Sequence, residues 1–523
     1  MRVTLVQPPQ GTRFGFSKVL RVEPLGLECV GSVLRLHGHE VHLVDLRLDR
    51  PSALRDHLRS WRPQGVGLTC GFTTDVFTTL QAAQWARDAL PEAAIFVGGH
   101  HASLVPGDFL FQGSPVEAVV VGEGETTGAD LVDALECRSD PGAVPGVLTL
   151  WNHDRGFRPR AYSDQLDSFP LPDRSLTKRY RARYHQGLAA PSACVETSRG
   201  CPFDCNFCSI WVFYGRRARR FSPERITEDL RQVKRLGGDH VFFTDDIAFL
   251  NRDLYQELAE SIRRAGIRMS YTCETRADLV VKYRDLFQTW QELGMGTIFL
   301  GIEKIDDAGL AAVRKRTKGG VTTNVDAIEI LRSCGITAMT SLITDPSWGE
   351  EDFDRLEEFV RLLRLTDPSF SILTPLPGTE LWESLKGQLT TDDYSRFDIM
   401  HLVLPARLGE QRFYERFARL YRLTEPKTRV TWEAARTFVG LALRGQAWVM
   451  RRVLGAVHEM RSPREYLRHP GSAPRPDFAP PAFGSASWVD RGRSYLSLRV
   501  AAPGTPRPSW PLPPVMATAP SSP

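Results

Sequence analysis

Short apolar runs alternate with amphipathic segments over the first 140 residues of the chain. The apolar runs read RVTLVQ, EVHLVDL, GVGLTC, AIFVGG and AVVVGEGE, and the segments between them include GLECVGSVLRLHG and TTLQAAQWARDAL. Buried strands that alternate with helices form a parallel sheet with helices on both faces. The pattern therefore predicts a doubly wound, Rossmann-like α/β domain over residues 1–140, with its ligand site at the carboxyl ends of the strands.

Three glycine-bearing turns follow strands of this predicted domain. They are TCGFTTD at 69–75, VGGHHAS at 97–103 and VGEGET at 121–126. Glycine allows positive φ and a close approach of the backbone to a ligand, so three such turns at one sheet edge favour a binding site there. No G-x-G-x-x-G follows the first strand, which disfavours a nicotinamide or flavin dinucleotide site.

A second α/β series follows residues 141–190, which are rich in Pro, Asp and Arg and are predicted to be a linker. Strand-like runs separated by helical patterns end near Thr197, Asp245, Thr275, Glu303, Thr344 and Thr374. These βα units predict an incomplete (β/α)6 barrel of parallel strands over residues 191–405. The active site of such a barrel lies at the carboxyl ends of its strands.

The pattern becomes helical and basic over residues 406–470. In VGLALRGQAWVMRRVLGAV, arginines border an apolar stretch, which is compatible with a helix at a membrane surface or with packing against the barrel. We favour packing. Residues 471–523 are rich in Pro, Ala and Ser and are predicted to be disordered.

Composition narrows the class of protein. Hydrophobic residues make up 42% and charged residues 24% of the 523 residues, as in a soluble globular protein, and the net charge of +4 gives no reason to expect a nucleic-acid partner. We find no signal peptide and no apolar run of about 18 residues, so we expect a cytoplasmic protein. Three of the nine cysteines are crowded together, and in a reducing compartment such a group is typical of metal binding or catalysis.

The crowded cysteines are Cys201, Cys205 and Cys208, in CPFDCNFC just after the first predicted barrel strand. A structural zinc site needs four ligands, typically as two separated pairs, and no second pair is present. Three thiolates on one loop suit an iron-sulfur cubane whose fourth iron stays open for chemistry. The isolated Cys194, Cys273 and Cys334 fall on or beside predicted elements and are interpreted as core residues.

C-x3-C-x2-C after the first strand of a six-unit barrel resembles the radical S-adenosylmethionine (SAM) superfamily. The resemblance implies that Cys201, Cys205 and Cys208 hold a [4Fe-4S] cluster and that SAM chelates its unique iron. Phe207 then occupies the aromatic position beside the adenine. Reductive cleavage of SAM gives a 5'-deoxyadenosyl radical, so the cofactors supply the difficult chemistry and the protein positions them.

Other polar residues at the predicted strand ends match this family's SAM contacts more loosely. Asp245 and Asp246 follow the second strand, where the family usually binds the SAM amino group. By the same resemblance, Arg276 would meet the SAM carboxylate and Glu303 the ribose hydroxyls. A helix cap or a surface ion pair is an equally good interpretation of each.

The N-terminal part is similar to the cobalamin-binding domains that precede many radical SAM barrels. EPLGLECVGSVLRLHGHEVHLVDL, VGGHHAS and VVVGEGE match that pattern in order. The D-x-H-x-x-G motif of cobalt-ligating domains is missing, so neither His39 nor His101 is assigned as an axial ligand. The residues expected to contact the corrin and its nucleotide tail are Gly98, Gly99, Ser103, Gly122, Glu123 and Gly124.

The whole order resembles class B cobalamin-dependent radical SAM enzymes. FPLPDRSL, TSRGCPFDCNFCSIW, TDPSWGEEDF and TPLPGTELW look most like the hopanoid C-3 methylase group. The resemblance implies a C-methyltransferase: one SAM methylates cob(I)alamin, a second yields the radical that takes hydrogen from an unactivated carbon, and methylcobalamin supplies the methyl group.

The resemblance also implies a small-molecule or lipid substrate, hopanoid-like by preference, and a reductase, flavodoxin or ferredoxin as electron donor. Contact with a membrane surface stays open. Two alternatives also remain: a cyclase or rearrangement enzyme like the anaerobic porphyrin cyclase, and a non-catalytic iron-sulfur protein.

Overall fold

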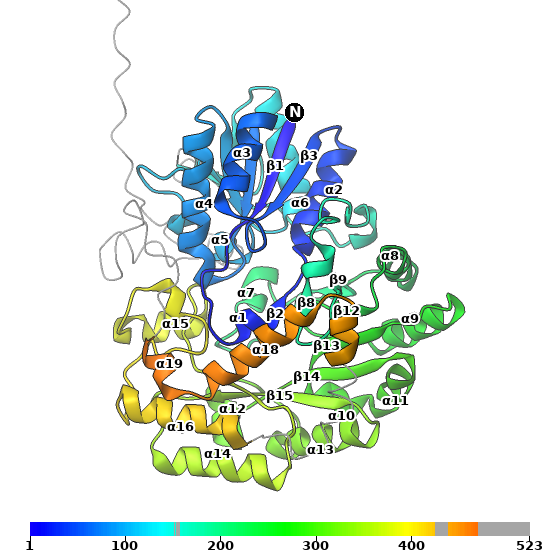
Figure 1. The fold of residues 1–523 in the computed structure, drawn as a ribbon, viewed down its shortest axis with the longest axis vertical. Coiled ribbons are helices and arrows are strands. Elements are labelled where there is room, and N and C mark those ends of the chain that lie inside the picture. Colours follow the sequence, from blue (N-terminus) through cyan, green and yellow to red (C-terminus); the bar gives the residue numbers. More distant parts are fainter. Residues whose placement is uncertain (151, 153–156, 424–437, 469–523) are drawn as a thin grey trace, which may run out of the picture.

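The computed structural model describes residues 1–150, 152, 157–423 and 438–468. An N-terminal α/β domain lies above a partial barrel in Figure 1, and a helical C-terminal region lies against both. This architecture confirms the fold class predicted from the sequence. The segment 471–523, predicted to be disordered, falls outside the described residues.

The N-terminal sheet has the strand order β3-β1-β4-β5-β6-β7. Its strands are β1 (Arg2–Gln7), β3 (Glu40–Asp45), β4 (Gly65–Thr69), β5 (Ala94–Gly98), β6 (Ala118–Val120) and β7 (Val147–Thr149). All pair in parallel except β7, which pairs antiparallel with β6 and carries the sheet into the segment predicted as a linker. The order reverses between β1 and β4, where a doubly wound sheet opens a ligand crevice at its carboxyl edge.

Helices cover both faces of this sheet. Those of the domain are α2 (Leu25–Leu36), α3 (Pro51–Trp61), α4 (Val76–Ala89), α5 (His100–Leu104) and α6 (Gly124–Glu136). The apolar side chains of α2 and α6 pack on one face, and those of α3 and α4 pack on the other. The near-continuous hydrophobic strands follow from this double burial.

The second sheet has six parallel strands in the order β16-β15-β14-β13-β12-β9, as the sequence predicts. They are β9 (Ser192–Val195), β12 (His240–Phe243), β13 (Ser270–Arg276), β14 (Met295–Glu303), β15 (Thr337–Thr344) and β16 (Ser369–Ile372). The outer helices are α8 (Pro223–Arg235), α9 (Arg252–Arg264), α10 (Ala277–Lys282), α11 (Arg284–Leu293), α12 (Asp307–Ala312), α13 (Gly320–Ser333), α14 (Glu350–Leu362) and α15 (Glu380–Leu385).

Alternate residues of the barrel strands face the helices and the lumen. Cys273, Ile298 and Leu300 lie in the core between strands and helices. Glu274 and Phe299 point the other way, and Glu274, Phe299 and Met339 are in register across three adjacent strands. The lumen therefore carries an acidic side chain beside apolar ones.

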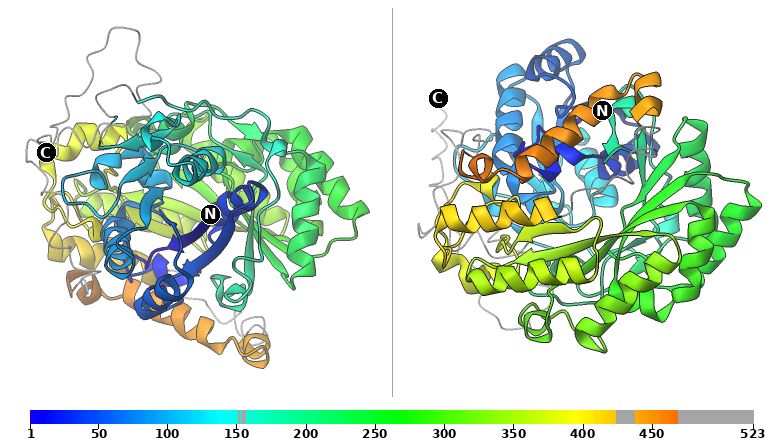
Figure 2. Two further views of the ribbon diagram at one scale, coloured as in Figure 1. Left: turned by 90° about the horizontal axis from the view of Figure 1, so that it is seen from above. Right: turned by 60° about the horizontal axis from the view of Figure 1, so that its bottom comes forward.

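The C-terminal region consists of α16 (Glu410–Leu423), α18 (Ala447–Met460) and α19 (Pro463–Arg468). Figures 1 and 2 show α18 at the junction of the two domains. It packs on α1 (Phe16–Val19), and its buried side chains are Val449, Ala456 and Met460. None of the described helices is long and apolar enough to cross a bilayer.

Part of the junction between the domains is apolar. Trp382, Tyr394 and Phe397, which follow the last barrel strand, share one hydrophobic core with Phe77 of α4. The hydroxyl of Tyr394 also donates to Asp108 at 2.8 Å. This side of the junction packs like a protein interior.

Another part of the junction depends on Arg174, whose side chain is completely buried. Its guanidinium group forms two 3.0 Å bonds to Asp229 of α8, pairs with Glu23 and donates to the Cys194 carbonyl oxygen at 2.6 Å. Burial and the nearby Glu23 raise the pKa of Glu28 to about 8, although Arg174 acts in the opposite direction. Arg174 thus joins the N-terminal domain, the connecting segment and the barrel.

Replacing Arg174 with Ala should strongly destabilise the protein. The change leaves the carboxylates of Glu23 and Asp229 buried without their cation, which costs about 3–5 kcal/mol. The measurement is the urea midpoint of unfolding. As a control, Arg179→Ala removes an exposed ion pair with Asp49, worth about 1 kcal/mol or less. Equal midpoint shifts for the two variants would contradict the role of Arg174.

Candidate functional site

The cysteine loop starts at the carboxyl end of β9 and is closed by a short hairpin. Strands β10 (Ser198–Arg199) and β11 (Arg219–Arg220) pair antiparallel at its two ends, and α7 (Ile210–Tyr214) lies inside it. Cys201, Cys205 and Cys208 all fall between these strands. The loop is thus at the rim of the barrel, where the sequence analysis expects it.

The three thiols lie in a largely buried environment. Burial raises the pKa of Cys201 to about 11 and that of Cys208 to about 12, and it also raises the pKa of Cys205. Two cations, Lys315 and Arg276, act on Cys205, and Arg276 Nη1 lies 3.9 Å from its sulfur. Thiolates here need a positive partner such as a metal, because burial otherwise favours the neutral thiol.

The number and type of ligands fit a cluster better than a single structural ion. Three cysteines lie on one loop, whereas a closed structural zinc site needs four ligands. Three soft thiolates suit an iron-sulfur cubane whose fourth iron stays open for chemistry.

Asp245 and Asp246 both face the start of this loop. Asp245 is buried and accepts hydrogen bonds from the Thr197 amide at 2.6 Å, the Ser198 amide at 3.1 Å and the Tyr255 hydroxyl at 2.7 Å. The Thr197 hydroxyl is a further donor to it. Asp246 accepts from the Gly200 amide at 2.7 Å, and burial raises its pKa to about 7. The Asp245 carboxylate thus accepts hydrogen bonds from several protein donors, whereas the bond described for Asp246 comes from the Gly200 amide alone.

A polar layer lies just below the loop. Arg276 bonds Asp278 and stacks on the Phe203 ring at 3.8 Å. Glu303 pairs with Lys315 at 2.9 Å and accepts from the Ser341 hydroxyl at 3.0 Å. Neither Arg276 nor Glu303 caps a helix with its side chain or lies at the surface. Sequence reasoning missed Lys315, because no motif marks it and only the fold brings it to the strand ends.

Glu274 is a second residue that the sequence analysis missed. Its side chain is exposed, but only to the lumen of the barrel. The surrounding barrel wall keeps it from bulk water, and this desolvation, together with the charge of Glu303, raises its pKa to about 7. Its position two residues before Arg276 on a strand was the available signal, because both must face the lumen. The rim and lumen are therefore rich in carboxyl groups.

Phe207 packs against Ile343, Leu373 and Leu381 at the ends of the last two barrel strands. A cavity of about 190 Å³ adjoins this cluster and is lined by Asn206, Lys304, Asp345 and Trp348 as well as Leu373 and Leu381. Phe207 itself does not line the cavity, but its neighbour Asn206 and its contacts Leu373 and Leu381 do.

The glycine turns of the N-terminal domain are linked by Ser103. Its buried hydroxyl donates to the Gly99 carbonyl at 2.8 Å and accepts from the Gly122 amide at 3.0 Å. Gly99 has φ 105°, and a side chain there would meet the Cys70 carbonyl oxygen at 2.7 Å. Gly98, at the end of β5, and Gly124, which begins α6, adjoin the two turns. Only glycine fits the Gly99 turn, and Ser103 fixes the turns relative to each other.

Both ring nitrogens of the buried His39 and His101 have partners in this structure. His101 contacts Thr73 at 3.1 Å and Asp108 at 2.9 Å. His39 contacts the Met1 amino group and Asp133. Ligation of cobalt by either histidine would require one of these contacts to break.

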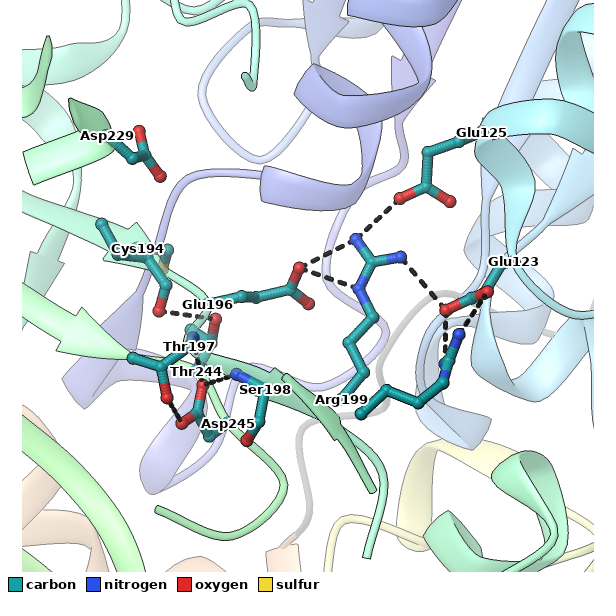
Figure 3. Close-up of polar contacts among 12 residues, drawn as sticks. Glu123, Glu125, Cys194, Glu196, Thr197, Ser198, Arg199, Asp229, Thr244 and Asp245 are labelled. Carbon is teal, nitrogen blue, oxygen red and sulfur yellow. Dashed lines mark hydrogen bonds and ion pairs between the residues drawn. The ribbon is translucent and has the colours of Figure 1, made fainter. Parts of the chain in front are cut away.

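Glu123 faces the barrel in this structure. Its carboxylate pairs with Arg199 and Arg219 at the base of the cysteine loop, and Arg199 also pairs with Glu125 and Glu196. Figure 3 shows the Arg199 guanidinium group at the centre of these three glutamates. The sequence analysis expected Glu123 to contact cobalamin and did not assign a role to its ion-pair partners. Only the junction of the two domains brings these charged residues together.

Comparisons with known proteins match both halves of the chain. The B12 binding domain family matches residues 18–132 and the Radical SAM superfamily matches residues 195–360. The hopanoid C-3 methylase of Methylococcus capsulatus is 39% identical over 487 residues, covering 91% of this chain and 92% of that protein. The anaerobic magnesium-protoporphyrin IX monomethyl ester cyclase of Synechocystis is 26% identical and covers 88% and 93% of the two chains.

A solved structure has the same fold. The radical S-adenosylmethionine methyltransferase TsrM from Kitasatospora setae, with cobalamin and a [4Fe-4S] cluster bound, has a TM-score of 0.63 and 18% identity over 87% of this chain and 99% of that one. The chain therefore belongs to the cobalamin-dependent radical SAM enzymes, as a methyltransferase whose cofactors are a [4Fe-4S] cluster, SAM and cobalamin.

Proposed function

We propose that this enzyme methylates an unactivated carbon of a hopanoid-like lipid. When bound, the cluster and SAM supply the 5'-deoxyadenosyl radical and cobalamin supplies the methyl group. A flavodoxin, a ferredoxin or their reductase would deliver the electron. The substrate class rests on the 39% identity to the hopanoid C-3 methylase, which extends over 91% of the chain.

One contact supports this arrangement above the others. His100 directly follows the Gly98-Gly99 turn, and its Nε2 lies 3.0 Å from the hydroxyl of Ser209, which directly follows Cys208. The carboxyl edge of the N-terminal sheet therefore lies against the cysteine loop, with α5 above α7 in Figure 1. A cobalamin at the first and a cluster at the second would face each other.

We assign the cluster to Cys201, Cys205 and Cys208. Arg276 and Lys315 are the cations that would hold the SAM carboxylate, and Lys315 would then share Glu303 with the ribose. The carboxyl groups of Asp246 and Glu274 have raised pKa values because they lie buried near other acids, and the positive ammonium and sulfonium groups of SAM would relieve this repulsion. Phe207 and its neighbouring cavity would take the adenine.

For cobalamin we retain the glycine turns. Gly98, Gly99, Gly122 and Gly124 expose backbone at the carboxyl edge of the sheet, and Gly99 and Gly122 have positive φ. Ser103 would act through the turns that it links, because its hydroxyl is already used. The apolar Phe299 and Met339 in the lumen are compatible with an apolar substrate.

The central test is transfer of a labelled methyl group. Enzyme reconstituted under anaerobic conditions with cobalamin, a reductant and SAM carrying a labelled methyl group should convert a hopanoid into a product that contains the label. S-adenosylhomocysteine and 5'-deoxyadenosine should accumulate with it, because one SAM is demethylated and one is cleaved. Mass spectrometry measures all three.

The cyclase alternative follows from the likeness to the porphyrin cyclase and predicts 5'-deoxyadenosine with an altered product that lacks the label. That result would overturn the methyl transfer proposed here. Iron and sulfide without any SAM-dependent reaction, over a panel of lipids, would instead favour the non-catalytic iron-sulfur protein.

Replacing Cys205 with Ala should remove the cluster and leave cobalamin binding intact. Two thiols cannot hold three irons, whereas the glycine turns belong to the other domain. Iron and sulfide analysis together with the absorption spectrum of bound cobalamin measures both. Cys137→Ala is the matched control, since Cys137 is exposed at the end of α6. Loss of cobalamin together with iron in Cys205→Ala would point to a structural role for the loop.

We further propose that the region around α18 contacts an anionic membrane surface, from which a lipid substrate would enter. One face of α18 is packed, but Leu454 on this helix is 54% exposed, and Leu443, which precedes the helix, is 84% exposed. Arg444 and Arg451 are exposed close to these leucines in the sequence, and the segment 438–458 contains no Asp or Glu. Exposed leucines bordered by arginines are typical of helices that bind at a lipid interface.

Changing both Leu443 and Leu454 to Asp should weaken binding to vesicles that contain phosphatidylglycerol, because it removes apolar contact and adds negative charge. Co-sedimentation measures the bound fraction. Leu362→Asp on α14 is the control, since Leu362 is 72% exposed on another helix. Undiminished sedimentation of the double variant, or wild-type protein that stays in the supernatant, would refute the contact.

A further inference from the structure

The two arginines at the ends of the cysteine loop face each other across its base. Arg199 and Arg219 are directly paired in the β10-β11 hairpin, and the loop with its three cysteines runs between them. Gly200 and Cys201 follow Arg199 immediately. Any movement of these arginines therefore moves the first cysteine.

Both arginines are held by the N-terminal domain. Arg219 makes a two-pronged pair with Glu123 at 2.7 and 3.0 Å. Arg199 contacts Glu123 at 3.1 Å and Glu125 at 2.7 Å, and it is supported within its own domain by Glu196 at 2.9 Å. Glu123 and Glu125 lie on either side of Gly124, where the glycine turn passes into α6. We call the five charged residues Arg199, Arg219, Glu123, Glu125 and Glu196 the ionic latch.

The latch is almost closed to water. The side chains of Arg199, Arg219 and Glu125 are 7%, 5% and 6% exposed, so their pairs are little screened. Burial alone would raise the pKa of Glu125, but Arg199 outweighs it and holds this pKa below its usual value. Arg199 pairs with all three carboxylates, and Glu123 pairs with both guanidinium groups, so Arg199 and Glu123 connect the whole group.

A second contact holds the middle of the loop, just after its last cysteine. Beside its contact with Ser209, the ring of His100 stacks on Phe213 of α7 at 4.4 Å. Tyr162 donates to the Phe213 carbonyl oxygen at 2.7 Å. The turns expected to bind cobalamin are thus connected to the cysteine loop at two places, its base at Arg199 and Arg219 and its middle at Ser209.

We propose that the ionic latch is a positioning device that sets the distance between cobalamin and the cluster, and that Glu123 and Glu125 act on the cysteine loop rather than on cobalamin. Two reactions that share one substrate site need their reacting atoms placed closely. Without the latch, each cofactor still binds in its own domain, but fewer of the radicals that form lead to methyl transfer. The inference needs both cofactors and does not depend on which lipid is the substrate.

The test compares Glu123→Gln, Glu125→Gln and Arg199→Lys with the wild-type enzyme. Pulsed electron paramagnetic resonance between the reduced cluster and cob(II)alamin gives their distance distribution without any substrate. We expect one narrow distribution in the wild type and a broadened or lengthened one in each variant, with unchanged iron and cobalamin contents. Asp130→Asn, which removes a surface pair with Arg160 from the same helix, should match the wild type.

Turnover gives a second readout where a substrate is known. The ratio of methylated product to 5'-deoxyadenosine should fall by about ten-fold or more in the variants, while SAM cleavage continues. A purely structural interface would lower both quantities together and leave the ratio unchanged.

Two further results would also overturn the proposal. One is an unchanged distance distribution in all three variants. The other is loss of cobalamin in Glu123→Gln but not in Glu125→Gln, which would make Glu123 a direct cobalamin contact. Arg199→Lys retains the positive charge, and so it keeps the test available if the glutamine variants fail to fold.

Discussion

The ion pairs of Arg199 fix where the cysteine loop lies relative to the N-terminal domain. The loop carries little regular structure, and its base is a hairpin of two residues on each side. A buried ion pair adds little net stability compared with apolar packing, but it is costly to break and has few acceptable geometries. The apolar contacts around Trp382 and Tyr394 can therefore hold the domains together, while the charged contacts determine their exact relative placement.

Arg174 serves the same purpose on another side of the junction. It lies in the sequence FPLPDRSL, and its partners Glu23 and Glu28 lie in EPLGLE, near the start of the N-terminal domain. Two stretches on which the family resemblance rests are thus parts of one buried ion cluster. The segment between the domains is more than a linker, since it contributes β7 to one sheet and the central cation to this cluster.

The sequence was sufficient for the features that depend on local pattern. Apolar runs predicted the parallel strands of both sheets but not the antiparallel β7, and the cysteine spacing predicted the loop at the barrel rim. It was insufficient where a role depends on a distant partner. Asp245 does follow its strand as expected, but Thr197 and Ser198 from the preceding strand end already fill its carboxylate. The roles of Glu123 and Lys315 could not be predicted for the same reason. Their ion-pair partners lie across the domain junction or across the barrel, and the hydrophobic pattern of the sequence does not indicate these partners.

The layers of the barrel lumen explain how a charged cofactor and an apolar substrate could share one site. Arg276, Gly301 and Ser341 form one layer in register, and Glu274, Phe299 and Met339 form the next layer away from the cysteine loop. A side chain at Gly301 would meet Lys315 Nζ at 2.7 Å, so glycine there makes room for the pair of Lys315 with Glu303. Charges are thus gathered near the loop, and apolar groups begin one layer below. An apolar molecule could then bind against Phe299 and Met339 beside SAM, and the raised pKa of Glu274 in the same layer favours its neutral form.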